Sequence, residues 1–142
     1  MQGAKAFVDT NILIYAYDST AGEKHEIANT IVSGLWDTGL GIVSTQVLQE
    51  FFVNVTGKIP KPIQPRTARE IVSDLLTWDV VVVDGKSILK GVEIHLRYKY
   101  SFWNALIIEA AIRSGSHLLF SEDLSDGQVI ENVTIKNPFP AK

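Results

Sequence analysis

Residues 6–14 constrain the fold of this chain more than any other stretch. Residues 6–8 are apolar and predict a short buried strand, and the apolar run that starts at residue 12 predicts a helix. Asp9 lies where this strand ends and this helix begins. In open parallel sheets, ligands bind at the carboxyl ends of the strands, most often where the strand order reverses. Asp9 is therefore either only the N-cap of the helix or an acid of a functional site.

The rest of the chain alternates between helical and strand patterns. Apolar spacing predicts helices near residues 27–36, 47–55, 66–76, 88–96 and 102–113, and strands near residues 40–44, 79–83, 117–120 and 133–135. Residues 79–83 are almost all valine, which is typical of a strand buried on both faces. This alternation predicts an α/β fold class: a three-layer α/β/α domain with a central, mainly parallel sheet.

The composition limits the function classes. The 142 residues are 46% hydrophobic and 20% charged, which is typical of one globular domain, and we expect it to span residues 1–142. The chain has no cysteine, no run long enough to cross a bilayer and no signal sequence, so we expect a cytoplasmic protein without membrane contact. The net charge of −3 gives no global attraction to nucleic acid. An RNA substrate would therefore depend on a local basic patch or on bound cations.

Two more acids are candidates for the same site as Asp9. Asp123 follows the strand predicted near residues 117–120, so it also lies at the carboxyl end of a strand, and the two aspartates can converge on one cleft. Glu50 lies about 130° from the centre of the apolar face of its helix, which by itself predicts a solvent-facing side chain. Glu50 faces a cleft only if this helix flanks the mouth of the sheet.

Asn104 is a polar residue near the start of the most apolar helix. It follows Ser101 by three residues, but Glu and Gln are the usual partners in a capping box, so capping explains it poorly. Its neighbours Trp103, Leu106 and Ile107 predict that this turn is largely buried, and a buried amide needs hydrogen-bond partners.

Several segments match one known family in combination. They are Phe7-Val8-Asp9-Thr10-Asn11, Glu50 before Phe51-Phe52, Ser101-Phe102-Trp103-Asn104-Ala105-Leu106-Ile107, Leu118-Leu119-Phe120-Ser121-Glu122-Asp123-Leu124 and the closing Asn137-Pro138-Phe139. Together they resemble the PIN domain, and within it the VapC-type ribonuclease toxins of bacterial toxin–antitoxin pairs. The resemblance runs almost from end to end of the chain.

The resemblance implies a metal-dependent endoribonuclease that hydrolyses RNA phosphodiester bonds with Mg²⁺ or Mn²⁺ held by an acidic cluster. By position, Asp9 matches the first acid of the family, Glu50 the second and Asp123 the fourth. The supporting residues implied in the same way are Thr10, Asn11 and Ser121. The resemblance also implies a small antitoxin partner and a homodimer.

Position 104 departs from the family pattern, which usually has aspartate there. Asparagine keeps an oxygen that can ligate a hard cation but lacks a full negative charge. We therefore expect Asp9, Asn104 and Asp123 as metal ligands, with Glu50 completing the catalytic set, and we expect reduced activity. The alternative is a catalytically weakened PIN module that acts by binding RNA or protein.

Other function classes match the residues less well. A phosphatase with Asp9 as nucleophile would need a second aspartate two residues later, where Asn11 stands. No Gly-rich turn of the dinucleotide-binding type follows the first strand. The three histidines show no ligand spacing and are given structural or surface roles.

Surface residues supply further predictions. For the dimer, the chain has more aromatic residues than one small core needs: Trp36, Phe51, Phe52, Tyr98 and Tyr100. Candidate RNA contacts are the basic residues Lys58, Lys61, Arg66, Arg69, Lys86, Lys90, Arg97 and Lys99. Most of these basic side chains are expected to be ordinary solvated surface.

Overall fold

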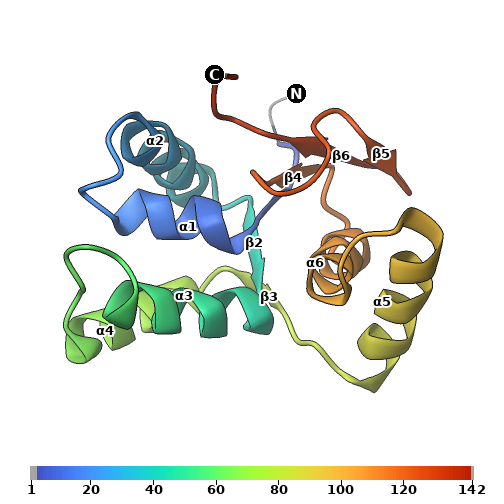
Figure 1. The fold of residues 1–142 in the computed structure, drawn as a ribbon, viewed down its shortest axis with the longest axis horizontal. Helices are drawn as coiled ribbons and strands as arrows, with labels where there is room; N and C mark the ends of the chain where they lie inside the picture. Colours follow the sequence, from blue (N-terminus) through green and yellow to red (C-terminus); the bar gives the residue numbers. More distant parts are fainter. Residues whose placement is uncertain (1–2, 142) are drawn as a thin grey trace.

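The computed structural model describes residues 3–141. Six strands form one sheet in the order β3-β2-β1-β4-β6-β5 (Figure 1). The strands are β1 (Ala6–Val8), β2 (Gly41–Ser44), β3 (Asp79–Val81), β4 (Leu118–Phe120), β5 (Val129–Ile130) and β6 (Val133–Lys136). The helices are α1 (Thr10–Tyr17), α2 (Glu23–Thr38), α3 (Thr45–Gly57), α4 (Pro65–Leu75), α5 (Gly85–Tyr98) and α6 (Phe102–Arg113).

The strand β1 lies in the middle of the sheet, and Phe7 is in register with Ile42 on β2 and with Leu119 on β4. All strand pairs are parallel except β5 with β6. The chain builds outward from β1 through β2 to β3, and then returns to the other side of β1 with β4. The strand order therefore reverses between β1 and β4, which is where open parallel sheets bind ligands.

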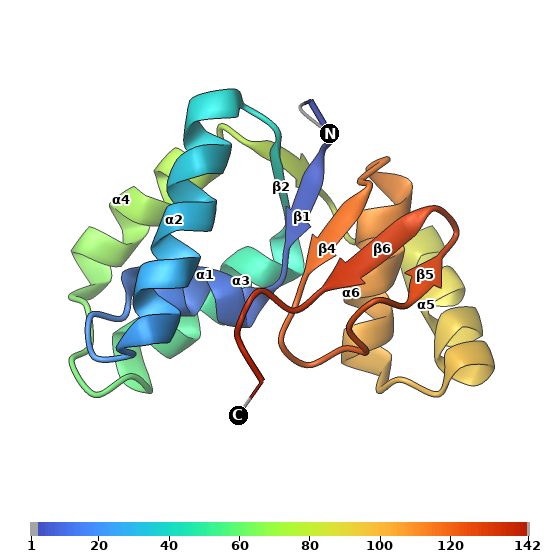
Figure 2. The ribbon, with the colours of Figure 1, turned by 90° about the horizontal axis from the view of Figure 1, so that it is seen from above.

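Helices flank the sheet, and the predicted fold class is confirmed. Helices α1 to α4 group on one side, and α5 and α6 pair on the other (Figures 1 and 2). The core between them is apolar, and its large side chains with no more than 2% exposure include Phe7, Leu13, Phe51 and Ile107. Serines cap two of the helices that border the site: Ser44 accepts from the Val47 amide at 3.2 Å, and Ser101 accepts from the Asn104 amide at 3.1 Å.

Two strand predictions were incomplete or wrong. The valine run does form β3, but this strand covers only Asp79–Val81 and lies at an edge of the sheet. Val82 is 60% exposed, so the expectation of burial on both faces is wrong. The short strand β5 was not predicted, and it pairs antiparallel with β6 through a turn in which Glu131 and Asn132 both have positive φ.

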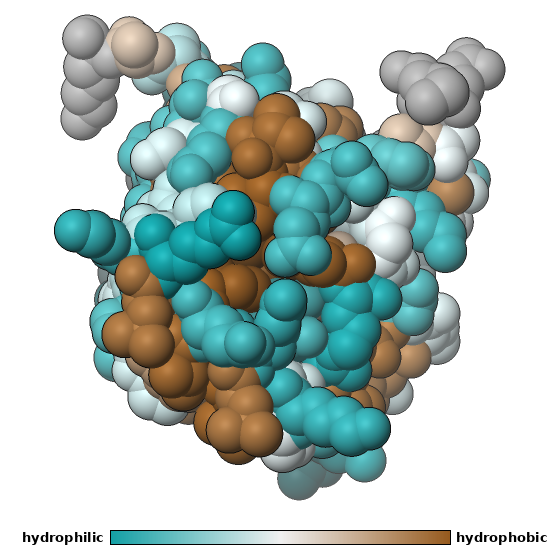
Figure 3. Space-filling model, turned by 90° about the vertical axis from the view of Figure 1, so that its right-hand side faces the viewer, coloured by the Kyte–Doolittle hydropathy of each residue, from teal (hydrophilic) through white to brown (hydrophobic). Residues whose placement is uncertain are grey.

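The helix α5 directs much of its apolar surface outward. Four apolar side chains of this helix are between 39% and 70% exposed: Ile88, Leu89, Val92 and Leu96. The inner face instead presents Gly91, where an added Cβ would lie 2.8 Å from Leu106 on α6, so the missing side chain allows the two helices to approach closely. Figure 3, which views the α5 side, shows hydrophobic patches between hydrophilic ones.

Within residues 3–141, every helix is too short or too polar to cross a membrane.

Candidate active site

Asp9 is the most deeply buried acid at the carboxyl edge of the sheet, with 5% of its surface exposed. Because it follows β1 directly, its backbone is extended and it serves as the N-cap of α1. Its Oδ1 accepts from the Thr10 amide at 2.7 Å, and its Oδ2 accepts from Ser121 Oγ at 2.7 Å. Asp9 is thus a cap, and it is also fixed by a hydroxyl from the end of the neighbouring strand β4.

Burial makes Asp9 an unusual carboxyl group. The pKa of Asp9 is raised from 3.8 to about 6, mainly because burial removes the carboxyl from water. The hydrogen bonds from Ser121 and Thr10 oppose this rise, and the nearby negative charges of Asp123 and Glu50 add to it. With a pKa of about 6, the carboxyl is roughly 90% ionised at pH 7. It therefore presents a poorly solvated negative charge that a cation or a positive group would stabilise.

Asp123 lies in the loop after β4, at the rim of the same pocket. Its Oδ2 accepts from Asn11 Nδ2 at 2.6 Å, and its backbone amide donates to Ser121 Oγ at 3.2 Å. Partial burial raises its pKa, the Glu122 carboxylate adds to this effect, and the Lys24 ammonium opposes it. Ser121 therefore contacts both aspartates and links the end of β1 to the loop after β4.

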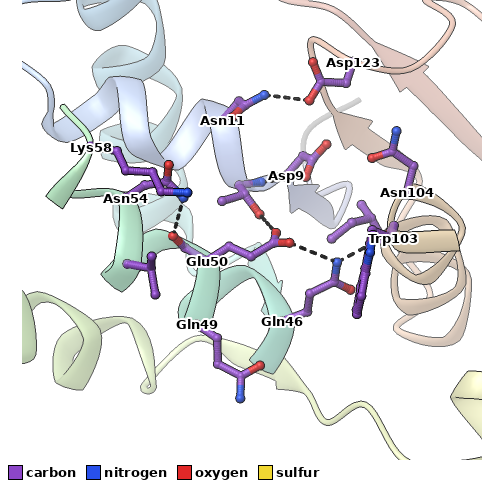
Figure 4. A pocket seen from close by; sticks show the side chains of 13 residues that line it. Asp9, Asn11, Gln46, Gln49, Glu50, Asn54, Lys58, Trp103, Asn104 and Asp123 are labelled. Atoms are coloured by element: carbon purple, nitrogen blue, oxygen red, sulfur yellow. Dashed lines mark hydrogen bonds between the residues drawn. The ribbon is translucent and has the colours of Figure 1, made fainter. Parts of the chain in front are cut away.

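Glu50 faces the pocket, so the solvent-facing prediction from its helical position is wrong. The reason is that α3 packs against α1 and flanks the mouth of the sheet. Thr10 Oγ1, at the start of α1, donates to Glu50 Oε1 at 2.6 Å. Gln46, one turn earlier on α3, donates from Nε2 to Glu50 Oε2 at 3.4 Å. These two contacts hold the carboxylate in the space between α1, α3 and α6 (Figure 4).

Asn104 lines the pocket from the first turn of α6. Its backbone amide donates to Ser101 Oγ, but within the described residues its side-chain amide makes no hydrogen bond. Trp103 beside it is 62% exposed, so the expectation that this residue helps to bury the turn is wrong. The side chain of Asn104 is therefore free to interact with a ligand in the pocket, because neither core packing nor helix capping uses its amide.

One pocket of about 480 Å³ lies at this edge of the sheet. Its lining includes the four predicted catalytic residues Asp9, Glu50, Asn104 and Asp123, together with Thr10 and Asn11 (Figure 4). The predicted supporting residue Ser121 is fully buried and is not part of the lining. Lys58 is the member of the basic set that reaches it. Gln46 and Trp103 also line the pocket. The sequence indicated no role for Gln46 and only a packing role for Trp103. The spacing of Gln46 four residues before Glu50, on the same helix face, is the signal that could have indicated it.

The donors in this pocket have the right chemistry for a hard divalent cation, because Mg²⁺ and Mn²⁺ prefer oxygen ligands. Asp9 and Asp123 offer carboxylates, and Asn104 offers an amide oxygen. Across residues 3–141, however, no group of three or more His, Cys, Asp or Glu side chains is arranged to hold a metal ion. A cation here would therefore take its third protein ligand from the Asn104 amide or complete its shell with water.

A mainly parallel sheet flanked by helices, with an acid-lined pocket where its strand order reverses, places the chain in the PIN-like α/β/α class. A family model of the PIN domain matches residues 6–125. The chain belongs to the PIN domain family, the ribonuclease family that its sequence motifs resemble. The strands β5 and β6 follow the matched residues and complete the same sheet.

Solved structures with the same fold include proteins of toxin–antitoxin systems. A toxin–antitoxin complex from Klebsiella pneumoniae superposes with a TM-score of 0.71 at 18% identity, covering 96% of this chain and 100% of that one. VapBC2 from Rickettsia felis, bound to a DNA fragment from its promoter, gives 0.65 at 18% identity, covering 93% and 97%. VapC20 from Mycobacterium tuberculosis, a toxin that cleaves the sarcin–ricin loop, gives 0.63 at 17% identity, covering 84% and 90%.

These identities are low, so the structural matches establish the shared fold and nothing finer. A comparison with curated proteins found no relative of this chain.

Proposed function

We propose that the chain is a metal-dependent endoribonuclease, the toxin of a type II toxin–antitoxin pair, whose activity is reduced by Asn104. The observation that carries this proposal is the convergence of two strand-end aspartates, Glu50 and an amide on one pocket. The membership of the PIN family and the toxin–antitoxin proteins among the structural matches support the same function. A cytoplasmic location agrees with an RNA substrate and with the absence of cysteine from the sequence.

In this proposal, Asp9, Asn104 and Asp123 hold Mg²⁺ or Mn²⁺ through their oxygen atoms. When bound, such a cation supplies a water that ionises near neutral pH and neutralises charge on the phosphate. Thr10 and Ser121 hold the Asp9 carboxylate with one hydrogen bond to each oxygen.

The remaining pocket residues act on the water and on the RNA backbone. Asn11 fixes the Asp123 carboxylate by its hydrogen bond of 2.6 Å. Glu50, oriented by Thr10, accepts a proton from an attacking water at its carboxylate. Lys58, on the pocket lining, contacts a neighbouring RNA phosphate.

Asn104 favours the second candidate function, a weakened PIN module that binds RNA or protein without efficient cleavage. With the amide in place of a carboxylate, the pocket has one negative charge fewer for a dication, and affinity for hard cations depends on ligand charge. Both candidates use the same pocket, and they differ in whether the residual metal affinity is sufficient for turnover.

Two exposed apolar surfaces fit the implied partners. A groove of about 510 Å³ between α3 and α4 is lined by side chains that include Leu48, Phe52, Val72 and Leu76. It shares Gln49 and Val53 with the acidic pocket, so an antitoxin segment seated there would lie next to the active site. The exposed stripe of α5 is the surface we assign to the homodimer. Of the aromatic residues predicted for the dimer, Phe51 is fully buried and is excluded.

The test is cleavage of a mixed RNA pool with Mg²⁺ or Mn²⁺ by three proteins: the natural chain, Asn104→Asp and Asp9→Ala. We expect slow metal-dependent cleavage by the natural chain, faster cleavage and tighter metal binding by Asn104→Asp, and no cleavage by Asp9→Ala. Cleavage that persists undiminished in Asp9→Ala would not depend on this pocket and would refute the assignment. Equal metal affinity and cleavage in the first two proteins would show that position 104 is not a ligand.

A further inference from the structure

The side chain of Trp103 is not part of the hydrophobic core. It is 62% exposed, although it stands on α6, where residues 105–111 are all buried. The other two tryptophans, Trp36 and Trp78, pack against each other edge to face with ring centroids 5.2 Å apart. Most of the Trp103 surface is in contact with water in the free chain, so this surface is available to a ligand that binds there.

The backbone and ring of Trp103 are held in place. Its carbonyl oxygen accepts from Gln46 Nε2 at 3.2 Å, which ties the first turn of α6 to α3. Its ring meets Phe102 edge to face, with centroids 5.4 Å apart. Gln46 itself is 7% exposed, so this anchor is buried. A ring held this way loses little conformational freedom when a flat ligand stacks on it.

The position of Trp103 points to the kind of ligand. It lines the acidic pocket and directly precedes Asn104, while Lys58 lines the same pocket from the end of α3 (Figure 4). The pocket therefore combines an aromatic ring, a cation and the acids of the proposed reaction. Proteins that bind single-stranded nucleic acid use aromatic rings for the bases and cations for the phosphates.

From this juxtaposition we propose that Trp103 is the stacking platform for an unpaired nucleobase next to the phosphate that is cleaved. The inference rests on the proposed ribonuclease function and deepens it, because it identifies the substrate at this position as an RNA with an unstacked base. Stacking requires a base that is not paired in a helix, so the cut falls in a loop or in a single strand. Stacking is tolerant of base identity, so this contact selects for accessibility of the base.

The first experiment measures binding of fluorescently labelled pentaadenylate in the presence of Mg²⁺, in an Asp9→Asn background that prevents cleavage. Adding Trp103→Ala should weaken binding by about 5- to 140-fold, the equivalent of about 1–3 kcal/mol for one stacked base. Trp103→Phe should restore most of the affinity, because the aromatic face is kept. The matched control is Trp36→Ala, which removes a tryptophan outside the pocket and should change the affinity less than twofold.

The second experiment replaces one nucleotide at a time by an abasic ribose. Removing the base at one position should weaken binding to the protein that carries Trp103 and should leave binding to the Trp103→Ala protein unchanged. This result is expected when that base and the ring contact each other. Equal affinities with and without the Trp103→Ala substitution, or equal abasic losses in both proteins, would overturn the stacking role, and the exposed ring would then belong to a protein contact. If Trp103→Ala with Asp9 intact cleaves RNA like the natural chain, only this inference fails. If neither the natural chain nor Asn104→Asp cleaves RNA, the proposed function fails.

Discussion

The charge on Asp9 should destabilise the metal-free protein, and Asp9→Asn should remove this cost. The carboxylate is 5% exposed, and its pKa is raised from 3.8 to about 6, mainly because burial removes it from water. Asparagine is a good N-cap residue and keeps the acceptor for the Thr10 amide. It also carries no charge, so the cost of burying a charge and the repulsion from the neighbouring acids are both absent.

The magnitude follows from the pKa. A rise from 3.8 to about 6 corresponds to about 3 kcal/mol at about 1.4 kcal/mol for each tenfold change in proton affinity. Asparagine reverses the direction of the hydrogen bond with Ser121, which costs about 1 kcal/mol. Asp9→Asn should therefore be more stable than the natural chain by about 2 kcal/mol when Asp9 is ionised in both the folded and the unfolded state.

The sign of the pH dependence is fixed by the raised pKa. Above about pH 6, the free-energy cost of the buried Asp9 charge is present in full. Between pH 6 and 3.8, Asp9 is protonated in the folded protein but still ionised in the unfolded chain, so this cost shrinks as the pH falls. Below pH 3.8 the cost is absent. Urea denaturation of both proteins with EDTA, from pH 4 to pH 8, measures this difference. A difference that does not change with pH, or an Asp9→Asn protein that is less stable at pH 8, would refute the reasoning.

The same assay with metal separates stability from function. Mg²⁺ at ten times its dissociation constant should stabilise the natural chain by about 1.4 kcal/mol, because only the folded state offers the site. The Asp9→Asn protein should gain much less, since it lacks one of the two carboxylates that we propose as metal ligands. Equal gains would mean that Mg²⁺ binds elsewhere.

Three further outcomes are expected. Ser121→Ala removes the hydroxyl that donates to Asp9 Oδ2 at 2.7 Å, so the pKa of Asp9 should rise further and the chain should lose about 1–2 kcal/mol, more at pH 8 than at pH 5. Gly41→Ala places a Cβ 2.5 Å from the ring of Trp78, so urea denaturation should show a loss of about 1–3 kcal/mol. Leu89→Glu, at a side chain 70% exposed on α5, should yield monomers in light scattering at micromolar concentration with a stability change within about 0.5 kcal/mol.

Each of these variants has a matched control. Ser73→Ala changes an exposed serine on α4 and should leave the Asp9 pKa unchanged. Gly34→Ala lies on α2 with nothing within 4 Å of the added Cβ, and it should stabilise the chain by about 0.5–1 kcal/mol. Leu76→Glu, at a side chain 55% exposed in the groove between α3 and α4, should leave the proposed dimer intact. A monomer in the Leu76→Glu sample, or a dimer in the Leu89→Glu sample, would show that the dimer interface does not lie on α5.

The strand-end acids could be predicted from the sequence because their positions depend on local order alone. A short apolar run followed by an acid puts Asp9 at the end of β1, and the same order puts Asp123 after β4. Any two parallel strands present their carboxyl ends on one edge, so the two aspartates had to lie on the same edge. Their proximity follows from β1 and β4 being neighbours in the sheet.

Surfaces and edges could not be read from the sequence in the same way. Periodicity predicts that α5 is a helix with an apolar stripe, but it does not say whether another part of the chain covers that stripe. The valine run likewise has the composition of an inner strand, and only the order of the whole sheet places β3 at an edge. In both cases the sequence does not say which other element packs against the helix or strand that the pattern predicts.

Glu50 and Asn104 show where a family resemblance added to physical reasoning. The phase of Glu50 on its own helix predicts exposure, and only the packing of α3 beside α1 turns it toward Thr10. The resemblance assigned it to the acidic set without that packing. Trp103, in contrast, belongs to a resembling segment but received no functional role, because an aromatic residue among apolar ones is normally part of the core.

The asparagine at position 104 connects the stability and the activity of this site. The pKa of Asp9 is already raised to about 6, through burial first and through the charges of Asp123 and Glu50 in addition. A fourth carboxylate on the same pocket would add repulsion, so Asn104→Asp should raise the pKa of Asp9 further and lower the metal-free stability. The same charge would attract a dication more strongly, so the stability of Asn104→Asp should depend more steeply on Mg²⁺ than that of the natural chain. In the proposed metal-dependent enzyme, asparagine at this position would therefore favour the metal-free fold over the metal-bound one.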